Sequence, residues 1–313
     1  METRKELVFI GLGRMGLAMS IRLAEQGYLV HGFDPSEEAL EAARQNGVKA
    51  YPSQERAVAA MEGRRVVWVM VPSKYVDGVL ATLRKQLTKD DIIIDGGNSF
   101  FKDSLHRHHD LDREEINFID VGTSGGVDGA RNGASLMIGG DPEPVAETEH
   151  IYKALAAPNG YGLVGGPGAG HFVKMIHNGI EYGMMGALAE GVNILHEHEE
   201  GLEINIDESL KAYEHGSIIS SSLTSWLVDA YQTPGYLERI AGVVPRGETE
   251  MEMEYVVNHN HARVLNAALT QRKLTRVEPS RTGSLISAMR NQFGGHHTLP
   301  SKANREEHAD TDK

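Results

Sequence analysis

In the first part of the chain, the spacing of hydrophobic residues changes within a few positions from that of a buried strand to that of a helix. An apolar run at Leu7–Ile10 ends in the glycine-rich stretch GLGRMG, and residues 15–27 then carry apolar side chains at helical spacing. A second apolar run, YLVHGFD, follows at once. Strand, glycine turn, helix and strand within about 30 residues are typical of the opening unit of a dinucleotide-binding fold.

The same alternation continues for about 100 residues more. A helix is expected at EEALEAARQNG and another over residues 74–87. Further strands are expected at VVWVMV, IIID, INFIDV and SLMIGG. Because these strands are near-continuous runs of Val and Ile, the pattern predicts a parallel sheet covered on both faces, as in α/β proteins.

The glycine-rich segment Gly162–Gly170 marks the end of this pattern. Beyond it the spacing favours one long helix over residues 171–198, then further helices interrupted near Pro234, Pro245 and Pro279. The sequence therefore predicts a Rossmann-type α/β domain followed by a mostly α-helical domain. The expected domains are a dinucleotide-binding domain (1–167), an all-helical substrate and dimerisation domain (168–295), and a polar C-terminal tail (296–313) that is mobile at its far end.

Composition supports a two-domain globular protein and narrows its chemistry. The 313 residues contain 40% hydrophobic and 24% charged residues, and no stretch reaches the roughly 20 apolar residues that span a bilayer. The amino terminus passes almost directly into a strand, so we expect no secretory leader and a cytoplasmic location. The absence of cysteine excludes disulfides and thiolate metal sites. A formal charge of −13 argues against nonspecific binding to nucleic acid or to membranes.

One basic segment departs from this acidic balance. Between Arg263 and Arg290 the chain carries six Arg and Lys residues, opposed only by Glu278. The segment is either a solvated basic helix face or a pocket for an anionic small molecule.

The glycine-rich stretch matches G-x-G-x-x-G, and Asp34 ends the second strand, where a carboxylate can accept hydrogen bonds from an adenosine ribose and repel a 2′-phosphate. We therefore expect NAD rather than NADP. The expected cofactor-binding residues are Gly11, Leu12, Gly13, Arg14, Met15, Gly16, Asp34, Val71, Pro72 and Asn98.

Three other segments carry candidate chemistry. Asn98 in DGGNS follows a strand at the edge where open α/β sheets hold ligands. Ser124, Gly125 and Gly126 form a loop able to offer a hydroxyl and backbone N–H groups to an anion, although both segments are also ordinary turn sequences. The most informative stripe lies on one helix face at i, i+3, i+4 and i+7: Lys174, His177, Asn178 and Glu181.

A solvated surface is the alternative for this stripe, but the neighbouring residues are apolar. A lysine whose pKa is lowered towards neutrality serves as general base and then acid, and His177 is one candidate perturber. The 15 histidines contain no HExxH arrangement, so we expect no metal site.

Taken in order, GLGRMG, DGGNS, GTSGG with GAR, GAGHFVKMIHNGIEY and RNQFGGH resemble the short form of the decarboxylating 6-phosphogluconate dehydrogenases, within the β-hydroxyacid dehydrogenase superfamily. The resemblance covers most of the chain. It implies oxidation of 6-phosphogluconate at C3, loss of CO2 and formation of ribulose 5-phosphate, a step of the pentose phosphate pathway, without a metal.

The resemblance also implies roles for individual residues. Lys174 is the general base and acid, and Glu181 protonates C1 of the enediol. The substrate-binding residues are Asn98, Ser124, Gly125, Gly126, His177, Asn178, Tyr182, Arg272, Arg290 and His296. The family further implies a homodimer, or a tetramer of such dimers. In it, the C-terminal segment that contains Arg290 and His296 completes the active site of the partner subunit.

One stretch departs from the family pattern. VVPRGETEMEME, at residues 243–254, replaces a segment that usually reads Gly-x-Gly-Lys/Arg-Trp-Thr and contributes a basic group. The number of phosphate contacts is therefore open. Two alternatives remain: a β-hydroxyacid dehydrogenase acting on a small acid such as 3-hydroxyisobutyrate, and a noncatalytic protein that senses a nucleotide.

Overall fold

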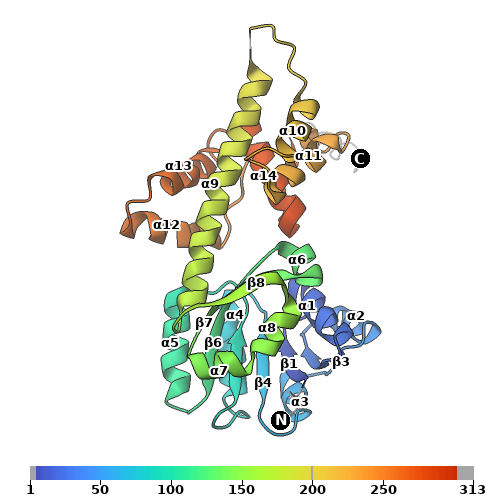
Figure 1. Cartoon of the computed structure of the whole chain (residues 1–313), viewed down its shortest axis with the longest axis vertical. Coiled ribbons are helices and arrows are strands. Elements are labelled where there is room, and N and C mark those ends of the chain that lie inside the picture. The colour runs from blue at the N-terminus through green and yellow to red at the C-terminus, as the bar shows by residue number, and fades with distance from the viewer. Residues whose placement is uncertain (1–4, 199, 302–313) are drawn as a thin grey trace, which may run out of the picture. The chain divides into compact units, whose positions relative to one another are not determined.

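The computed structural model describes residues 5–198 and 200–301. The chain divides into two compact units, the first ending at Met175 and the second beginning at Ile176 (Figure 1). Within the described residues, no helix is both long and apolar enough to cross a membrane.

The first unit is built on an eight-stranded sheet with the strand order β3-β2-β1-β4-β5-β6-β7-β8. Its strands are β1 Glu6–Ile10, β2 Leu29–Phe33, β3 Lys49–Ala50, β4 Val66–Val69, β5 Ile92–Asp95, β6 Asn117–Ser124, β7 Ala134–Gly139 and β8 Ala156–Gly165. Its helices are α1 Arg14–Glu25, α2 Glu37–Gln45, α3 Gln54–Ala59, α4 Ser73–Leu83, α5 Phe101–Asp112, α6 Gly126–Asn132, α7 Pro142–Glu147 and α8 Glu149–Leu155.

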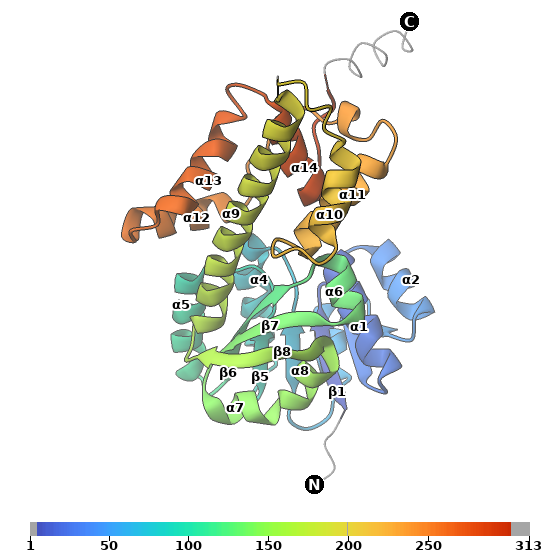
Figure 2. The same ribbon diagram turned by 45° about the horizontal axis from the view of Figure 1, so that its top comes forward.

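Helices flank the sheet of the first unit (Figure 2). Alternate residues of its strands pack on opposite faces. Leu7 and Phe9 of β1 belong to a core shared with α1, α2 and α8, whereas Val8 and Ile10 belong to a core shared with α3, α4 and α5. Burial on both faces explains why these strands are continuous apolar runs. The predicted α/β fold, with helices on both faces, is confirmed.

The prediction of an all-parallel sheet is wrong at one edge. The strands β1 to β6 run parallel where they pair, but β7 is antiparallel to β6, and β8 is parallel to β7. A parallel return needs a crossover of about a dozen residues or more, and the segment 125–133 between β6 and β7 is shorter than that. The chain therefore turns back through α6.

The pattern of apolar residues does not predict β8, nor the short β3 and α3. The strand β8, AAPNGYGLVG, lies at the sheet edge and is mostly half-buried or exposed. Its Pro, Asn and Gly residues are turn formers, and nothing on its outer side selects for apolar alternation.

The helix α9, Ala169–Glu197, begins in the first unit and continues into the second, and it confirms the predicted long helix. The second unit also contains α10 Ile206–Glu214, α11 Ser222–Gln232, η1 Leu237–Arg239, α12 Thr249–His259, α13 Arg263–Leu274 and α14 Arg281–Gly294. Helix α11 ends before Pro234 and α14 begins after Pro279, with Ser280 as N-cap, as the breaker residues predict.

The core of this unit joins α9, α11 and α14, where Met185, Leu227 and Ile286 are fully buried. The first residues of the expected C-terminal tail are tied to it, because Ala241 N donates to Leu299 O at 2.7 Å and Ser301 N donates to Arg239 O at 2.9 Å. The far end of the tail, which we expected to be mobile, lies outside the described residues.

Candidate active site

The loop after β1 brings backbone atoms so close together that side chains are excluded. A Cβ on Gly11, whose φ is +97°, would lie 2.3 Å from the carbonyl oxygen of Met70, and a Cβ on Gly16 would lie 1.9 Å from the carbonyl oxygen of Gly11. Gly16 therefore lets α1 pack against the strand, and Gly11 allows the turn next to β4. These are the roles that the dinucleotide fingerprint assigns to its glycines.

Asp34 ties the end of β2 to the glycine loop. Its carboxylate accepts hydrogen bonds from Leu12 N at 2.8 Å and from Ser36 N at 2.9 Å. Because β2 is the neighbour of β1 in the sheet, the carboxylate lies beside the glycine loop, where the sequence predicts a ribose contact.

The N-terminus of α1 has the features of a diphosphate site. Its N-cap is Gly13, which makes no side-chain cap hydrogen bond, and the first turn contains no acidic residue. Gly13 and Arg14 are exposed. The helix dipole and the first N–H groups of α1 therefore face an open position suited to an anion. Val71 and Pro72 follow β4, on the other side of the point where the strand order reverses.

The predicted loops after β5 and β6 lie beside the first turns of α9. Thr123 of β6 donates through Oγ1 to Gly96 O at 3.0 Å, which joins the DGGNS loop to the loop that carries Ser124. A Cβ on Gly122 would lie 2.3 Å from Cβ of Lys174. The structure thus brings Asn98, Ser124 and Lys174 to one region of the first unit.

The first turn of α9 is fixed by a residue that the sequence analysis missed. The Asp120 carboxylate, fully buried in β6, accepts hydrogen bonds from Gly168 N at 2.7 Å and from His171 N at 2.8 Å. Burial raises the pKa of this carboxyl group, while the two N–H donors and His171 oppose that rise. Asp120 therefore caps α9 from outside the helix and sets the position of Lys174 one turn later.

The polar stripe continues along α9 in the second unit. His177 Nδ1 lies 3.3 Å from Asn178 Oδ1 and 4.0 Å from Glu181 Oε2. Asn178 is 8% exposed, and His177 and Glu181 are half-buried. A fully solvated helix face, the alternative for this stripe, does not fit this burial. At 4.0 Å the carboxylate and the imidazole form an ion pair when the imidazole is protonated, and proton exchange between them needs a closer approach or a bridging water.

A second cluster in the same unit contains two buried arginines. Arg272 of α13 is 2% exposed, and its guanidinium carbon lies 3.2 Å from the centroid of the Tyr182 ring. Arg290 of α14 is 8% exposed and donates to Pro245 O at 3.3 Å. The burial of Arg272 lowers its pKa to about 10, with Arg290 adding a smaller repulsion, and burial also lowers the pKa of Arg290.

Among the described residues, neither guanidinium forms an ion pair with a carboxylate, and Arg272 Nε has no hydrogen-bond partner. Buried charges in proteins are normally paired. Two neighbouring cations with no carboxylate within ion-pair distance, and only the more distant attraction of Glu181 and Glu250, therefore form a candidate site for an anion, and the planar guanidinium fork suits phosphate.

The acidic stretch at residues 243–254 does not neutralise these two arginines. Glu250 of α12 accepts two hydrogen bonds from Arg276, both at 2.9 Å, and Glu254 accepts one from Lys273 at 2.5 Å. Glu250 and Glu254 of α12 thus pair with Arg276, which follows α13, and with Lys273 of α13. The basic segment at residues 263–290 is therefore mostly ion-paired or buried, and not a uniformly solvated face.

The role of Arg290 and His296 in a partner subunit stays a prediction, and within one chain these two residues lie apart. Arg290 belongs to the same chain as the Arg272 and Tyr182 that it faces. His296 is exposed, with its ring 5.5 Å from that of Phe293, and so lies outside the buried cluster. Because α14 packs on α11 of its own unit, Arg290 reaches the cluster without a second subunit.

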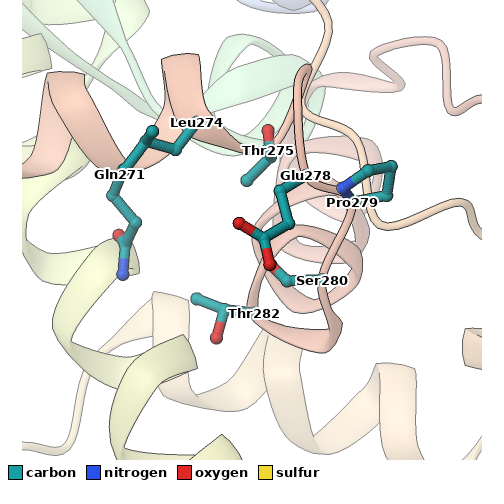
Figure 3. Close-up of a pocket in the computed structure, with 7 residues that line it drawn as sticks. All are labelled: Gln271, Leu274, Thr275, Glu278, Pro279, Ser280 and Thr282. Carbon is teal, nitrogen blue, oxygen red and sulfur yellow. The ribbon is translucent and has the colours of Figure 1, made fainter.

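The helical unit also has a surface hollow of about 250 Å³ that contains none of the predicted site residues (Figure 3). Its lining residues are Gln271, Leu274, Thr275, Glu278, Pro279, Ser280 and Thr282.

In the described part of the chain, no three His, Asp or Glu side chains gather in a group that could hold a metal ion.

The fold, the polar stripe on α9 and the cluster of two buried arginines define a dinucleotide-binding oxidoreductase with a helical second domain. Residues 6–166 match the model for the NAD-binding domain of 6-phosphogluconate dehydrogenase, and residues 170–233 match the model for the C-terminal domain of that enzyme. The chain belongs to the 6-phosphogluconate dehydrogenase family.

Individual relatives agree with this placement. The chain is 35% identical over 291 residues to YqeC of Bacillus subtilis, which is provisionally named a 6-phosphogluconate dehydrogenase. The match covers 92% of this chain and 97% of that protein. It is 37% identical over 232 residues to the NAD(+)-dependent decarboxylating 6-phosphogluconate dehydrogenase of Haloferax volcanii, covering 74% of this chain and 76% of that protein.

Solved structures support the fold. A Plasmodium falciparum 6-phosphogluconate dehydrogenase matches with a TM-score of 0.75 and 24% identity, covering 92% of this chain and 63% of that one. A Mycobacterium tuberculosis 3-hydroxyisobutyrate dehydrogenase matches with a TM-score of 0.68 and 20% identity, covering 91% of this chain and 99% of that one.

Proposed function

We propose that this protein catalyses the oxidative decarboxylation of 6-phosphogluconate to ribulose 5-phosphate and CO2, with NAD as hydride acceptor. The observation that carries the proposal is the pair of buried arginines without a carboxylate partner, Arg272 and Arg290. A small hydroxyacid has no second anionic group for such a pair, whereas the phosphate of a sugar acid supplies one.

The residues of the first unit would hold the cofactor. The glycine loop leaves room for a pyrophosphate at the start of α1, and Asp34 would accept hydrogen bonds from the adenosine ribose. A 2′-phosphate would meet this carboxylate, so NAD is favoured over NADP. The bound nicotinamide supplies the acceptor for the hydride from C3 of the substrate.

The residues on α9 would move the protons. Lys174 takes the proton of the C3 hydroxyl and later returns a proton to the carbonyl oxygen, which draws electrons from the breaking bond to C1. Glu181 then protonates the enediol at the carbon that was C2 of the substrate and becomes C1 of ribulose 5-phosphate. Asn98, Ser124 and Asn178 orient the sugar acid, and its phosphate lies at the two arginines.

This proposal assigns residues 1–167 to nucleotide binding and 168–295 to substrate binding and dimerisation. It places the protein in the cytoplasm as a homodimer or a tetramer of dimers, at the pentose phosphate step that the family resemblance implies.

The test is the rate of NADH formation with 6-phosphogluconate, gluconate and 3-hydroxyisobutyrate, each with NAD and with NADP, together with CO2 release. Gluconate is the matched control because it lacks only the phosphate. We expect kcat/KM to be at least ~10²-fold higher for 6-phosphogluconate, since charge-assisted hydrogen bonds contribute roughly 1.5–3 kcal/mol each. Faster turnover of 3-hydroxyisobutyrate without CO2 would favour the small-acid alternative.

A further inference from the structure

The loop that carries Asn98 is closed by buried polar contacts. Asp95, at the end of β5, is fully buried and accepts hydrogen bonds from Gly97 N at 3.2 Å and from Ser99 Oγ at 2.7 Å. Ser99 is 3% exposed. The residues immediately before and after Asn98 are therefore both bound to one carboxylate, which limits the positions that the Asn98 backbone can adopt.

The cation that faces this carboxylate comes from α5. Arg107 donates through Nη1 to Ser99 Oγ at 3.0 Å and to Asp95 Oδ2 at 3.4 Å, and through Nε to Asp77 of α4 at 2.8 Å. Its side chain is 7% exposed, whereas that of Asp77 is 79% exposed. The guanidinium of Arg107 thus bridges the exposed Asp77 of α4 and the buried loop after β5.

An arginine is not the residue that packing alone would select here. Buried ion pairs contribute little net stability, because the desolvation of both charges offsets their attraction, and apolar residues of similar volume often serve as well. The planar fork, however, binds two acceptors in a fixed geometry. Arg107 therefore contributes here by fixing the geometry of the Asn98 loop.

The same face of α5 also contacts the start of α9. Ser104, one turn before Arg107, is fully buried and lies 2.7 Å from His171 Nδ1 through its Oγ. One helix face therefore holds the Asn98 loop through Arg107 and the helix that bears Lys174 through Ser104.

We propose that Arg107 is a positioning residue that acts through Ser99 and Asp95 to hold Asn98 for hydride transfer. The inference rests on the proposed function, in which Asn98 touches the reacting molecules. Arg107 itself does not touch substrate or cofactor. Misplacing a positioned group by about 1 Å can cost up to about 10²-fold in rate, so Arg107 is expected to affect kcat more than substrate or cofactor binding.

The test is a double-mutant cycle with Arg107→Met, Asn98→Ala and the double variant, with Ser99→Ala and Arg107→Lys in parallel. Arg113→Met is the matched control, because Arg113 follows α5 and its side chain is 69% exposed. We expect Arg107→Met to lower kcat at least ~10-fold, with the dissociation constant of NAD within about threefold of wild type. The primary deuterium isotope effect with substrate deuterated at C3 should rise.

The double variant decides between positioning and general stability. If Arg107 acts through Asn98, the double variant should turn over no more slowly than Asn98→Ala alone, because the two effects are then not additive. Additive losses, or an unchanged isotope effect in folded Arg107→Met, would overturn the proposal. Ser99→Ala keeps the buried ion pair, so it gives the same comparison if Arg107→Met does not fold.

A measurement without substrate separates this inference from the proposed function. Amide hydrogen exchange should become faster in peptides that contain residues 96–99 of Arg107→Lys, and should be unchanged in the Arg113→Met control. Unchanged exchange in that loop refutes the role of Arg107 whatever the substrate is. Failure of wild type to oxidise 6-phosphogluconate, with the loop exchange as expected, refutes the proposed function alone.

Discussion

Replacing Arg272 with Met should make the free protein more stable while weakening its binding of the sugar phosphate. Burial lowers the pKa of Arg272 from 12.5 to about 10. That difference corresponds to roughly 3 kcal/mol by which the folded protein disfavours the charged guanidinium. Methionine loses the stacking on Tyr182, worth about 1 kcal/mol, so the net gain in the free energy of unfolding is about 2 kcal/mol.

The sign of this effect depends on pH in a defined way. Because the folded pKa lies below the unfolded one, the penalty is fully present below about pH 10 and is relieved only as the pH rises above that value. The gain should therefore be constant across the neutral range. It is measured by urea or thermal unfolding of the ligand-free protein, where it should raise Tm by several degrees.

Binding should change in the opposite direction. At an effective dielectric constant of about 20, a guanidinium about 4 Å from a phosphate gains roughly 4 kcal/mol per unit charge, and desolvation removes part of it. We expect KM for 6-phosphogluconate to rise ~10²-fold in Arg272→Met, with the dissociation constant of NAD unchanged. The stabilisation of wild type by 6-phosphogluconate should also be lost.

Arg276→Met is the matched control for Arg272→Met. Arg276 follows directly after the helix that carries Arg272, but it pairs with buried Glu250, so its removal leaves a carboxylate without its fork. This variant should lose stability, by at least about 1 kcal/mol and less than the roughly 3–5 kcal/mol of a fully buried pair. If Arg272→Met is destabilised like Arg276→Met, or keeps the wild-type KM, Arg272 is a structural residue and the anion-site reasoning fails.

Three further predictions concern the cofactor, the proton transfers and the subunits. Asp34→Asn should narrow the preference for NAD over NADP, measured as the ratio of kcat/KM values, and an NADP advantage in wild type would contradict the role of Asp34. Lys174→Met and Glu181→Gln should each lower kcat by at least ~10²-fold with NAD still bound, and activity within a few-fold of wild type would exclude that residue as the proton-transfer group. Mixing Lys174→Met with Arg290→Met under subunit exchange should not restore activity, because Arg290 lies with Arg272 of its own chain. Recovered activity in verified heterodimers would show that the tail completes the partner's site.

The sheet could be predicted where burial on both faces selects continuous apolar runs. This is the case in β4 and β5, whose residues are nearly all buried. The direction of β7 could not be read from its own residues. It depends on the short connection after β6 and on which neighbour is available, both of which are properties of the assembled sheet. The edge strand β8 has no periodic apolar pattern, because it is mostly half-buried or exposed.

The candidate site divides in a similar way. The stripe from Lys174 to Glu181 was visible because helical spacing alone puts these residues on one face. Asp120 and Arg107 were not visible, although both are buried and both orient predicted residues. Each acts across a contact between β6 and α9 or between α5 and the loop after β5, and such pairings are absent from the local pattern.

The two arginines show why a local charge count is a poor guide to an anion site. By sequence, the segment 263–290 is strongly basic and the stretch 243–254 is acidic, and neither count separates Arg272 from Arg276. The packing of α12 on α13 makes the separation, because the acidic side chains reach Arg276 and Lys273 and leave Arg272 unpaired. What defines the site is the charge that remains after the helices have paired. The acidic departure from the family pattern is therefore compatible with a phosphate site: Glu250 and Glu254 are already bound by neighbouring cations, and the positive charge of the buried arginine pair is left for the ligand.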